Sequence, residues 1–154
     1  MREILFRGKR TDNGEWVESI SIHYPQSTNY KGTCWLNGWH ERANDWINVD
    51  PATVGQFTGL VDKHGKRIFQ GDILRIAKAM DGWGGYNYPP IEYPKNALVK
   101  WDLCAWMWEI NGECTFYIHF PDAWCHYECE VIGNIHDNPE LLKGGDTDGK
   151  ERTE

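Results

Sequence analysis

The sequence has no apolar run of about 18 residues, the length that a membrane-spanning helix needs. It has no apolar segment near Met1 followed by small residues, so we expect no export by a signal peptide and a cytoplasmic location. It also has no basic excess, because 16 Lys and Arg face 23 Asp and Glu, giving a net charge of −7. Binding to nucleic-acid backbones or anionic membranes needs a basic face. The charge therefore disfavours a nucleic-acid partner without excluding one, and we expect no membrane partner.

Motifs of catalysis and nucleotide binding are missing as well. The chain has no G-x-S-x-G nucleophile elbow and no papain-type cysteine signature. Its glycine-rich stretch, 82–85, lacks the Lys-Ser/Thr of a P-loop, and no helical pattern follows it. We therefore expect a protein without enzymatic activity and without a cofactor.

The five cysteines are an odd number, which together with the missing signal peptide indicates reduced thiols. Zinc sites usually combine two closely spaced ligand pairs, and the spacing Cys125-x3-Cys129 is a weak match without a second pair. On a strand, both of these cysteines would lie on the apolar face. We predict no metal site and keep His119, Cys125 and Cys129 as weak candidates. A metal-binding protein or enzyme stays an alternative, centred on Cys114, His119, Cys125, His126 and Cys129.

Short strands and turns dominate the pattern along the chain. Asn-Gly, the favoured hairpin dipeptide, occurs at 13–14 and 111–112, and no period of 3.6 residues runs beyond about two helical turns. We predict a mostly β fold, a small barrel-like sheet of SH3-like or related type, with long irregular loops at 24–46 and 77–97. Strands are expected at 4–6, 15–22, 47–49, 53–60, 67–69, 73–76, 97–102, 105–110, 114–120 and 124–132.

The 154 residues suit one ordinary domain or two small ones. We expect a domain at 1–144, which two small β subdomains at about 1–76 and 97–144 could make up. Asn138, Pro139 and Gly144 favour a one-turn helix, with Asn as its N-cap, Pro at its first position and Gly past its end. The polar residues 145–154 are expected to form a disordered tail.

Nine Trp and seven Tyr make the chain rich in aromatic residues. Because Trp and Tyr are enriched at binding hot spots, the two long loops are candidate binding surfaces. The loops could equally fold back and cover a small core. A subunit interface would satisfy both readings, so we expect a homo-oligomer. A groove that stacks the bases of a nucleic acid would need a basic lining, which the net charge of −7 disfavours. The candidate interface residues are Trp35, Trp39, Trp83, Tyr86, Tyr88 and Tyr93.

Three segments resemble the YopX-like family, small proteins encoded mainly by temperate phages and other mobile elements of bacteria. They are REILFRG at 2–8, VGQFTGLVDKHGKRIFQGDIL at 54–74 and EVIGNIHDNPELL at 130–142. The resemblance implies a mostly β, self-associating protein of the bacterial cytoplasm and carries over no catalytic residue. Its motif residues are interpreted as structural, with glycines at turns and aspartates that accept hydrogen bonds from turn amides. These are Gln56, Thr58, Gly59, Asp62, Gly65, Gly71, Asp72, Gly133, Asn134, Asn138 and Pro139.

We therefore expect a non-enzymatic accessory protein, a β adaptor that binds an unknown protein partner through its aromatic loops. An acidic DNA mimic or a nucleic-acid-binding module is a further alternative. The 23 carboxylates permit the mimic, but they form no regular array in the sequence.

Overall fold

The computed structural model describes residues 3–24, 34–37, 46–78, 94–102, 105–110, 112–117 and 128–143. Within these ranges the protein is mostly β, as the sequence predicts, and its helical segments are two short 3-10 turns, η2 (Pro51–Thr53) and η3 (Pro139–Leu142). None of the described helices is long and apolar enough to cross a membrane. The chain divides into two compact units, residues 1–61 with 65–71 and residues 62–64 with 72–154.

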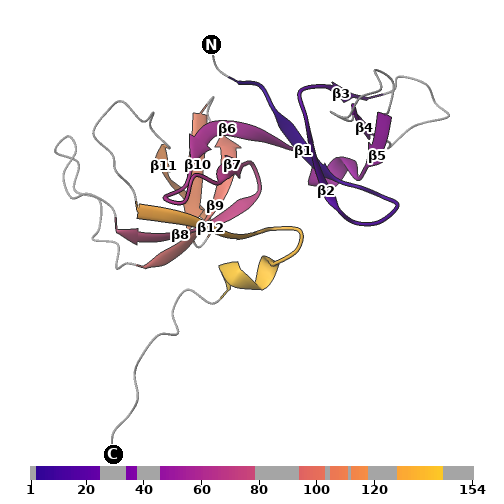
Figure 1. The fold of residues 1–154 in the computed structure, drawn as a ribbon. Coiled ribbons are helices and arrows are strands. Elements are labelled where there is room, and N and C mark those ends of the chain that lie inside the picture. The colour runs from indigo at the N-terminus through magenta and orange to yellow at the C-terminus, as the bar shows by residue number, and fades with distance from the viewer. Residues whose placement is uncertain are drawn as a thin grey trace, which may run out of the picture. The chain divides into compact units, whose positions relative to one another are not determined.

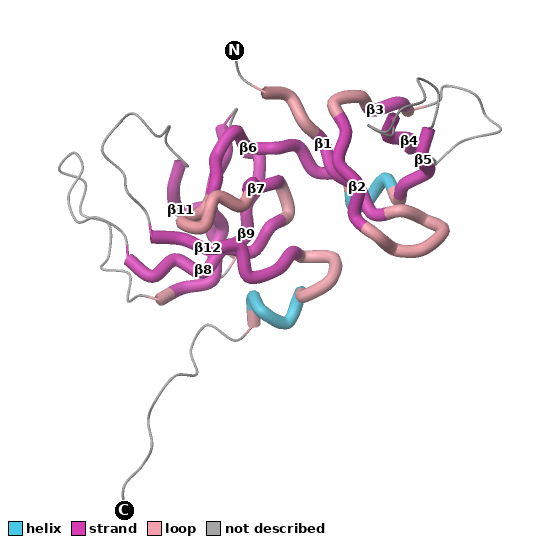
Figure 2. Tube along the Cα trace, viewed as in Figure 1, coloured by secondary structure: helices cyan, strands magenta, loops and turns pink. Residues whose placement is uncertain are grey.

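The first unit contains a four-stranded antiparallel sheet in the order β2-β1-β6-β7 (Figures 1 and 2). The turn that joins β1 to β2 passes through Gly14, whose positive φ of 74° is the conformation that the Asn-Gly dipeptide favours. Leu5, Phe57 and Phe69 form a buried cluster on this sheet. The strands are β1 (Phe6–Lys9), β2 (Trp16–Ser19), β6 (Gly55–Val61) and β7 (Arg67–Phe69).

A second sheet of the first unit has three antiparallel strands, β3 (Ile22–His23), β4 (Cys34–Asn37) and β5 (Trp46–Val49). Strand β4 lies inside 24–46, for which the sequence predicts a long loop or irregular hairpin. The sequence shows no alternation here because Cys34, Trp35 and Leu36 are all apolar, although their burial alternates in the structure. Cys34, Leu36 and Val49 are fully buried on the inner side.

The second unit contains a five-stranded antiparallel sheet in the order β11-β10-β9-β8-β12, which curls without closing among the described strands. Consecutive residues of the central strands are buried, so both faces of the sheet are covered. The SH3-like assignment stays a prediction. The strands are β8 (Asp72–Lys78), β9 (Lys95–Asp102), β10 (Ala105–Ile110), β11 (Glu113–Tyr117) and β12 (Glu128–Asn134).

The segment after β12 forms a 3-10 turn where the sequence predicts a one-turn helix. Asn138 occupies the N-cap position, but its side chain makes no capping hydrogen bond. The turn before it is held by Asn134, whose Oδ1 accepts hydrogen bonds from the backbone N–H groups of His136 and Asp137, each at 3.0 Å. The predicted tail at 145–154 lies outside the described residues.

Candidate binding face

Of the six predicted interface aromatics, Trp35 lies in the described part of the chain, on β4. The other five, Trp39, Trp83, Tyr86, Tyr88 and Tyr93, fall outside the described residues, so the two aromatic loops stay a prediction.

The alternating burial of the three-stranded sheet places Trp35 on its outer side. Cys34 and Leu36 point inward, and Trp35 and Asn37 point outward. In β5, Trp46 and Asn48 share the outer side, while Ile47 and Val49 face the core. The register pairs His23 of β3 with Trp35, and Asn37 with Trp46. We call His23, Trp35, Asn37, Trp46 and Asn48 the aromatic face.

Three rings of the aromatic face lie next to one another. The rings of His23 and Trp35 stack with their centroids 5.8 Å apart and their planes 8° from parallel. His23 also contacts Trp46, at 5.7 Å between centroids and a tilt of 53°. Trp46 keeps 46% of its surface exposed, which is high for a large aromatic residue. The cluster therefore presents flat, partly exposed rings from three neighbouring strands.

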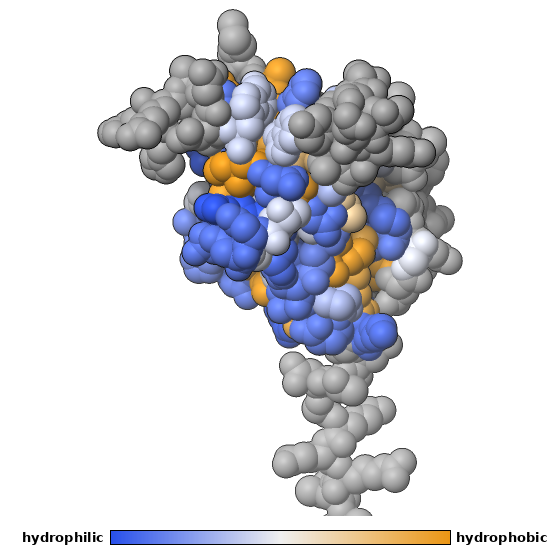
Figure 3. Space-filling model, turned by 90° about the vertical axis from the view of Figure 1, so that its right-hand side faces the viewer, coloured by the Kyte–Doolittle hydropathy of each residue, from blue (hydrophilic) through white to orange (hydrophobic). Residues whose placement is uncertain are grey.

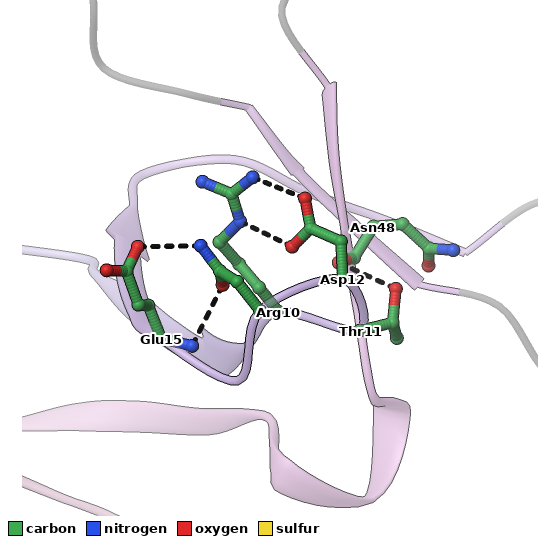
Figure 4. A network of polar contacts seen from close by, with 6 residues as sticks. Arg10, Thr11, Asp12, Glu15 and Asn48 are labelled. Atoms are coloured by element: carbon green, nitrogen blue, oxygen red, sulfur yellow. Dashed lines mark hydrogen bonds and ion pairs between the residues drawn. The ribbon is translucent and has the colours of Figure 1, made fainter.

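The five residues of the aromatic face include no Lys, Arg, Asp or Glu, and nearby Arg10 and Asp12 form an ion pair. The β1–β2 turn is a network of polar contacts (Figure 4) in which the guanidinium of Arg10 donates to both carboxylate oxygens of Asp12, at 2.8 and 2.5 Å. The hydrogen bond from Arg10 holds the pKa of Asp12 below its ordinary value. Thr11 N–H donates to the carbonyl of Asn48 at 3.1 Å, which ties this turn to β5. The network therefore supports the face from its edge.

Arg7, a basic residue near the N-terminus, is likewise engaged in internal contacts. The guanidinium carbon of Arg7 lies 4.8 Å from the ring centroids of both Trp16 and Phe69, a cation–π arrangement on each side. Figure 3 shows that the described residues on the side of the molecule at the right of Figure 1 are mainly hydrophilic, with apolar areas between them. The described surface thus offers no row of unpaired basic side chains of the kind that follows a nucleic-acid backbone.

Two cysteines have described side chains, and neither suits nucleophilic chemistry. Cys34 and Cys129 are buried and form no disulfide. Burial raises the pKa of the Cys34 thiol above its ordinary value. For Cys129, burial and then the neighbouring charge of Asp62 raise the thiol pKa. A raised pKa keeps the thiol protonated, and the protonated form is a poor nucleophile and metal ligand.

The metal alternative finds no support among the described residues, which contain no group of three or more His, Cys, Asp or Glu able to hold an ion. Cys129 lies in β12, and Cys114 lies in β11. His119, Cys125 and His126 fall outside the described residues, so the full set of candidates is not placed.

The motif residues between 56 and 72 make the backbone contacts of two turns. Thr58 Oγ1 donates to the carbonyl of Ile68 at 2.8 Å. Gly59, Gly65 and Gly71 all have positive φ, between 80° and 87°. Asp62 Oδ1 accepts from His64 N–H at 2.8 Å, and its Oδ2 accepts from Val131 N–H at 3.0 Å. These contacts and φ values all belong to the backbone conformation of the turns.

Sequence reasoning did not single out His23 or Trp46 as site residues. A signal existed for Trp46, because the alternation of residues 46–49 places it opposite to Ile47 and Val49. His23 carried no such signal, since its place beside Trp35 depends on strand pairing across a long segment.

Comparison with known proteins identifies a family and a similar solved structure. A family model described as YopX protein matches residues 5–143. Among solved structures, the chain is similar to protein EF1440 from Enterococcus faecalis, with 24% identity over 90% of this chain and 97% of that chain and a TM-score of 0.48. No curated protein matches.

Proposed function

The chain belongs to the YopX family, and from this premise we propose that it is a non-enzymatic β protein that binds another macromolecule through the aromatic face. The expected role as an accessory protein of a phage or other mobile element, acting in the cytoplasm of a bacterial host, is part of this proposal. So is the expectation that the long aromatic loops help to select the partner.

The observation that carries the proposal is the exposure of Trp46 beside His23 and Trp35. Fully burying a large apolar side chain is worth about 1.5–3 kcal/mol, and covering the 46% of Trp46 that is exposed would recover part of this free energy. Large rigid rings also lose little conformational entropy on binding, which is why Trp and Tyr dominate hot spots. The ring cluster therefore has the composition of an interface core, with Asn37 and Asn48 as polar neighbours.

The described site chemistry favours binding over catalysis. The two described thiols have raised pKa values, and the guanidinium of Arg10 near the face is paired with Asp12. Neither arrangement supplies a nucleophile with an adjacent base.

A tagged pull-down from host-cell lysate, with and without nuclease, tests the proposal. We expect Trp46→Ala to reduce capture of the partner at least tenfold with an unchanged melting temperature. Trp101→Ala is the matched control, because Trp101 is 51% exposed and belongs to β9 of the second unit and not to the aromatic face. Equal capture by both variants, together with equal self-association of both, would refute the proposal. Capture that disappears with nuclease would replace the protein partner with nucleic acid.

A further inference from the structure

The aromatic face has the chemistry of a surface that recognises proline. It is uncharged, it belongs to a three-stranded antiparallel sheet, and its rings lie side by side across the strands. Proline-rich segments dock on aromatic-lined surfaces because their extended conformation is preformed and little entropy is lost on binding. Their backbone carbonyls have no internal partners and are therefore open to donors such as an indole N–H.

The spacing of the rings fits such a ligand. Neighbouring ring centroids on the face are 5.8 and 5.7 Å apart. A polyproline II segment has three residues per turn and advances about 3.1 Å per residue, so one turn spans about 9 Å. One turn of the ligand would therefore extend over two neighbouring rings of the face. A nucleic-acid strand would need basic groups for its phosphates, and the face has none.

The chain itself carries a segment of this chemistry. Residues 88–94 read Tyr-Pro-Pro-Ile-Glu-Tyr-Pro and contain three of the seven prolines in the sequence. Each proline fixes its own φ near −65° and pushes the residue before it toward extended conformations. Pro94 at the end of this segment is described and exposed, immediately before β9 begins at Lys95.

We propose that the aromatic face binds the proline-rich segment 88–94 of a second copy of this chain. The inference deepens the proposed function, on which it rests, by naming the partner of the same surface. In a two-fold dimer each copy would bind the segment 88–94 of its partner, so that the same contact forms twice.

A complementation experiment on the full chain tests this assignment by sedimentation velocity. We expect the wild type to be a dimer, and Trp46→Ala and the triple variant Pro89→Ala, Pro90→Ala, Pro94→Ala each to raise the dimer dissociation constant at least tenfold. An equimolar mixture of the two variants should form a heterodimer, because one supplies an intact segment and the other an intact face. Trp101→Ala should stay dimeric, and circular dichroism should show that every variant folds.

A peptide spanning residues 86–95 provides the second measurement. It should bind the triple-proline variant, with a change in Trp fluorescence, and the same peptide with its three prolines replaced by Ala should not. A wild-type dimer that the proline substitutions leave intact would overturn the proposal. A monomeric wild type would also overturn it if the peptide binds the triple variant but not the wild type. In that case the segment would occupy the face of its own chain. Binding of oligo-dT in place of the peptide would also overturn it.

The inference and the proposed function can fail separately. If the peptide does not bind but Trp46→Ala still abolishes capture of a host protein, the inference falls and the binding function stands. If Trp46→Ala changes neither self-association nor capture, both fall.

Discussion

Gly55 and Gly65 belong to the same family motif, yet the structure requires glycine at each for a different reason. A Cβ on Gly55 would lie 2.5 Å from the backbone carbonyl oxygen of Gln70, far inside contact distance. That carbonyl belongs to the backbone and cannot rotate away. Gly65 has open space around it, but its φ of 80° lies in the left-handed region that disfavours most side chains. One position is therefore limited by space and the other by backbone conformation.

Gly55→Ala should lower the free energy of unfolding by about 3 kcal/mol, because β6 would have to move away from Gln70. Gly65→Asn should lower it by less than about 1 kcal/mol, since Asn tolerates positive φ and its Cβ meets no atom within 4 Å. Urea denaturation measures both values. Equal losses in the two variants would mean that the contact with Gln70 does not limit the side chain at position 55.

At the scale of the element, the edge strand β12 shows how a sheet edge is covered. Strand β12 ends the order of the five-stranded sheet, so one of its sides has no neighbour among the described strands. Residues 62–64 of the same unit lie along it, and Lys63 N–H donates to the carbonyl of Cys129 at 3.1 Å. Lys63 also forms an ion pair with Glu130 at 2.7 Å. Covered edges of this kind resist pairing with other chains.

Asp62→Asn tests this edge, because an amide has one acceptor oxygen where the carboxylate has two. Either His64 N–H or Val131 N–H then loses its partner, which should cost about 1–3 kcal/mol in this buried position. Hydrogen exchange at the Val131 amide should become faster. Asp12→Asn, in an exposed ion pair, is the control and should change stability by less than about 1 kcal/mol. A loss no larger than in the control would exclude Asp62 as a support of β12.

For the molecule as a whole, the acidic net charge and the lack of Lys, Arg, Asp and Glu among the five residues of the aromatic face favour association by burial of rings. The net charge of −7 gives no attraction to phosphates, and the internal pairing of Arg10 with Asp12 removes one of the few basic groups near the face. Association through the face should then depend on the burial of rings and not on ion pairs.

Raising the salt concentration from 50 to 200 mM should therefore change the dissociation constant by less than about threefold. A protein that contacts 6–10 phosphates would lose affinity by about 10³–10⁵ over the same range. Sedimentation velocity at the two salt concentrations measures this for self-association, and pull-down yield measures it for a host partner. A steep salt dependence would show that charged groups outside the aromatic face carry the binding.

Local chemistry by itself determined the turns and the mostly β character of the protein. Asn13-Gly14 and the glycines of the family motif indicate turns because positive φ is a property of the residue and its neighbours. The strands at 67–69 and 105–110 were predicted with the bounds that the structure has. The residues on one face of a short strand such as 46–49 also follow from alternation alone.

Only the tertiary structure decided which strands pair, and with them the aromatic face. His23 meets Trp35 and Trp46 through the register of three short strands, and Asp62 meets Val131 across 69 positions of sequence. The division of residues 62–64 and 65–71 between two units is likewise invisible in the sequence. Turn conformation and side-chain alternation are local properties, whereas register is fixed by the packing of distant segments against a shared core, which no local pattern encodes.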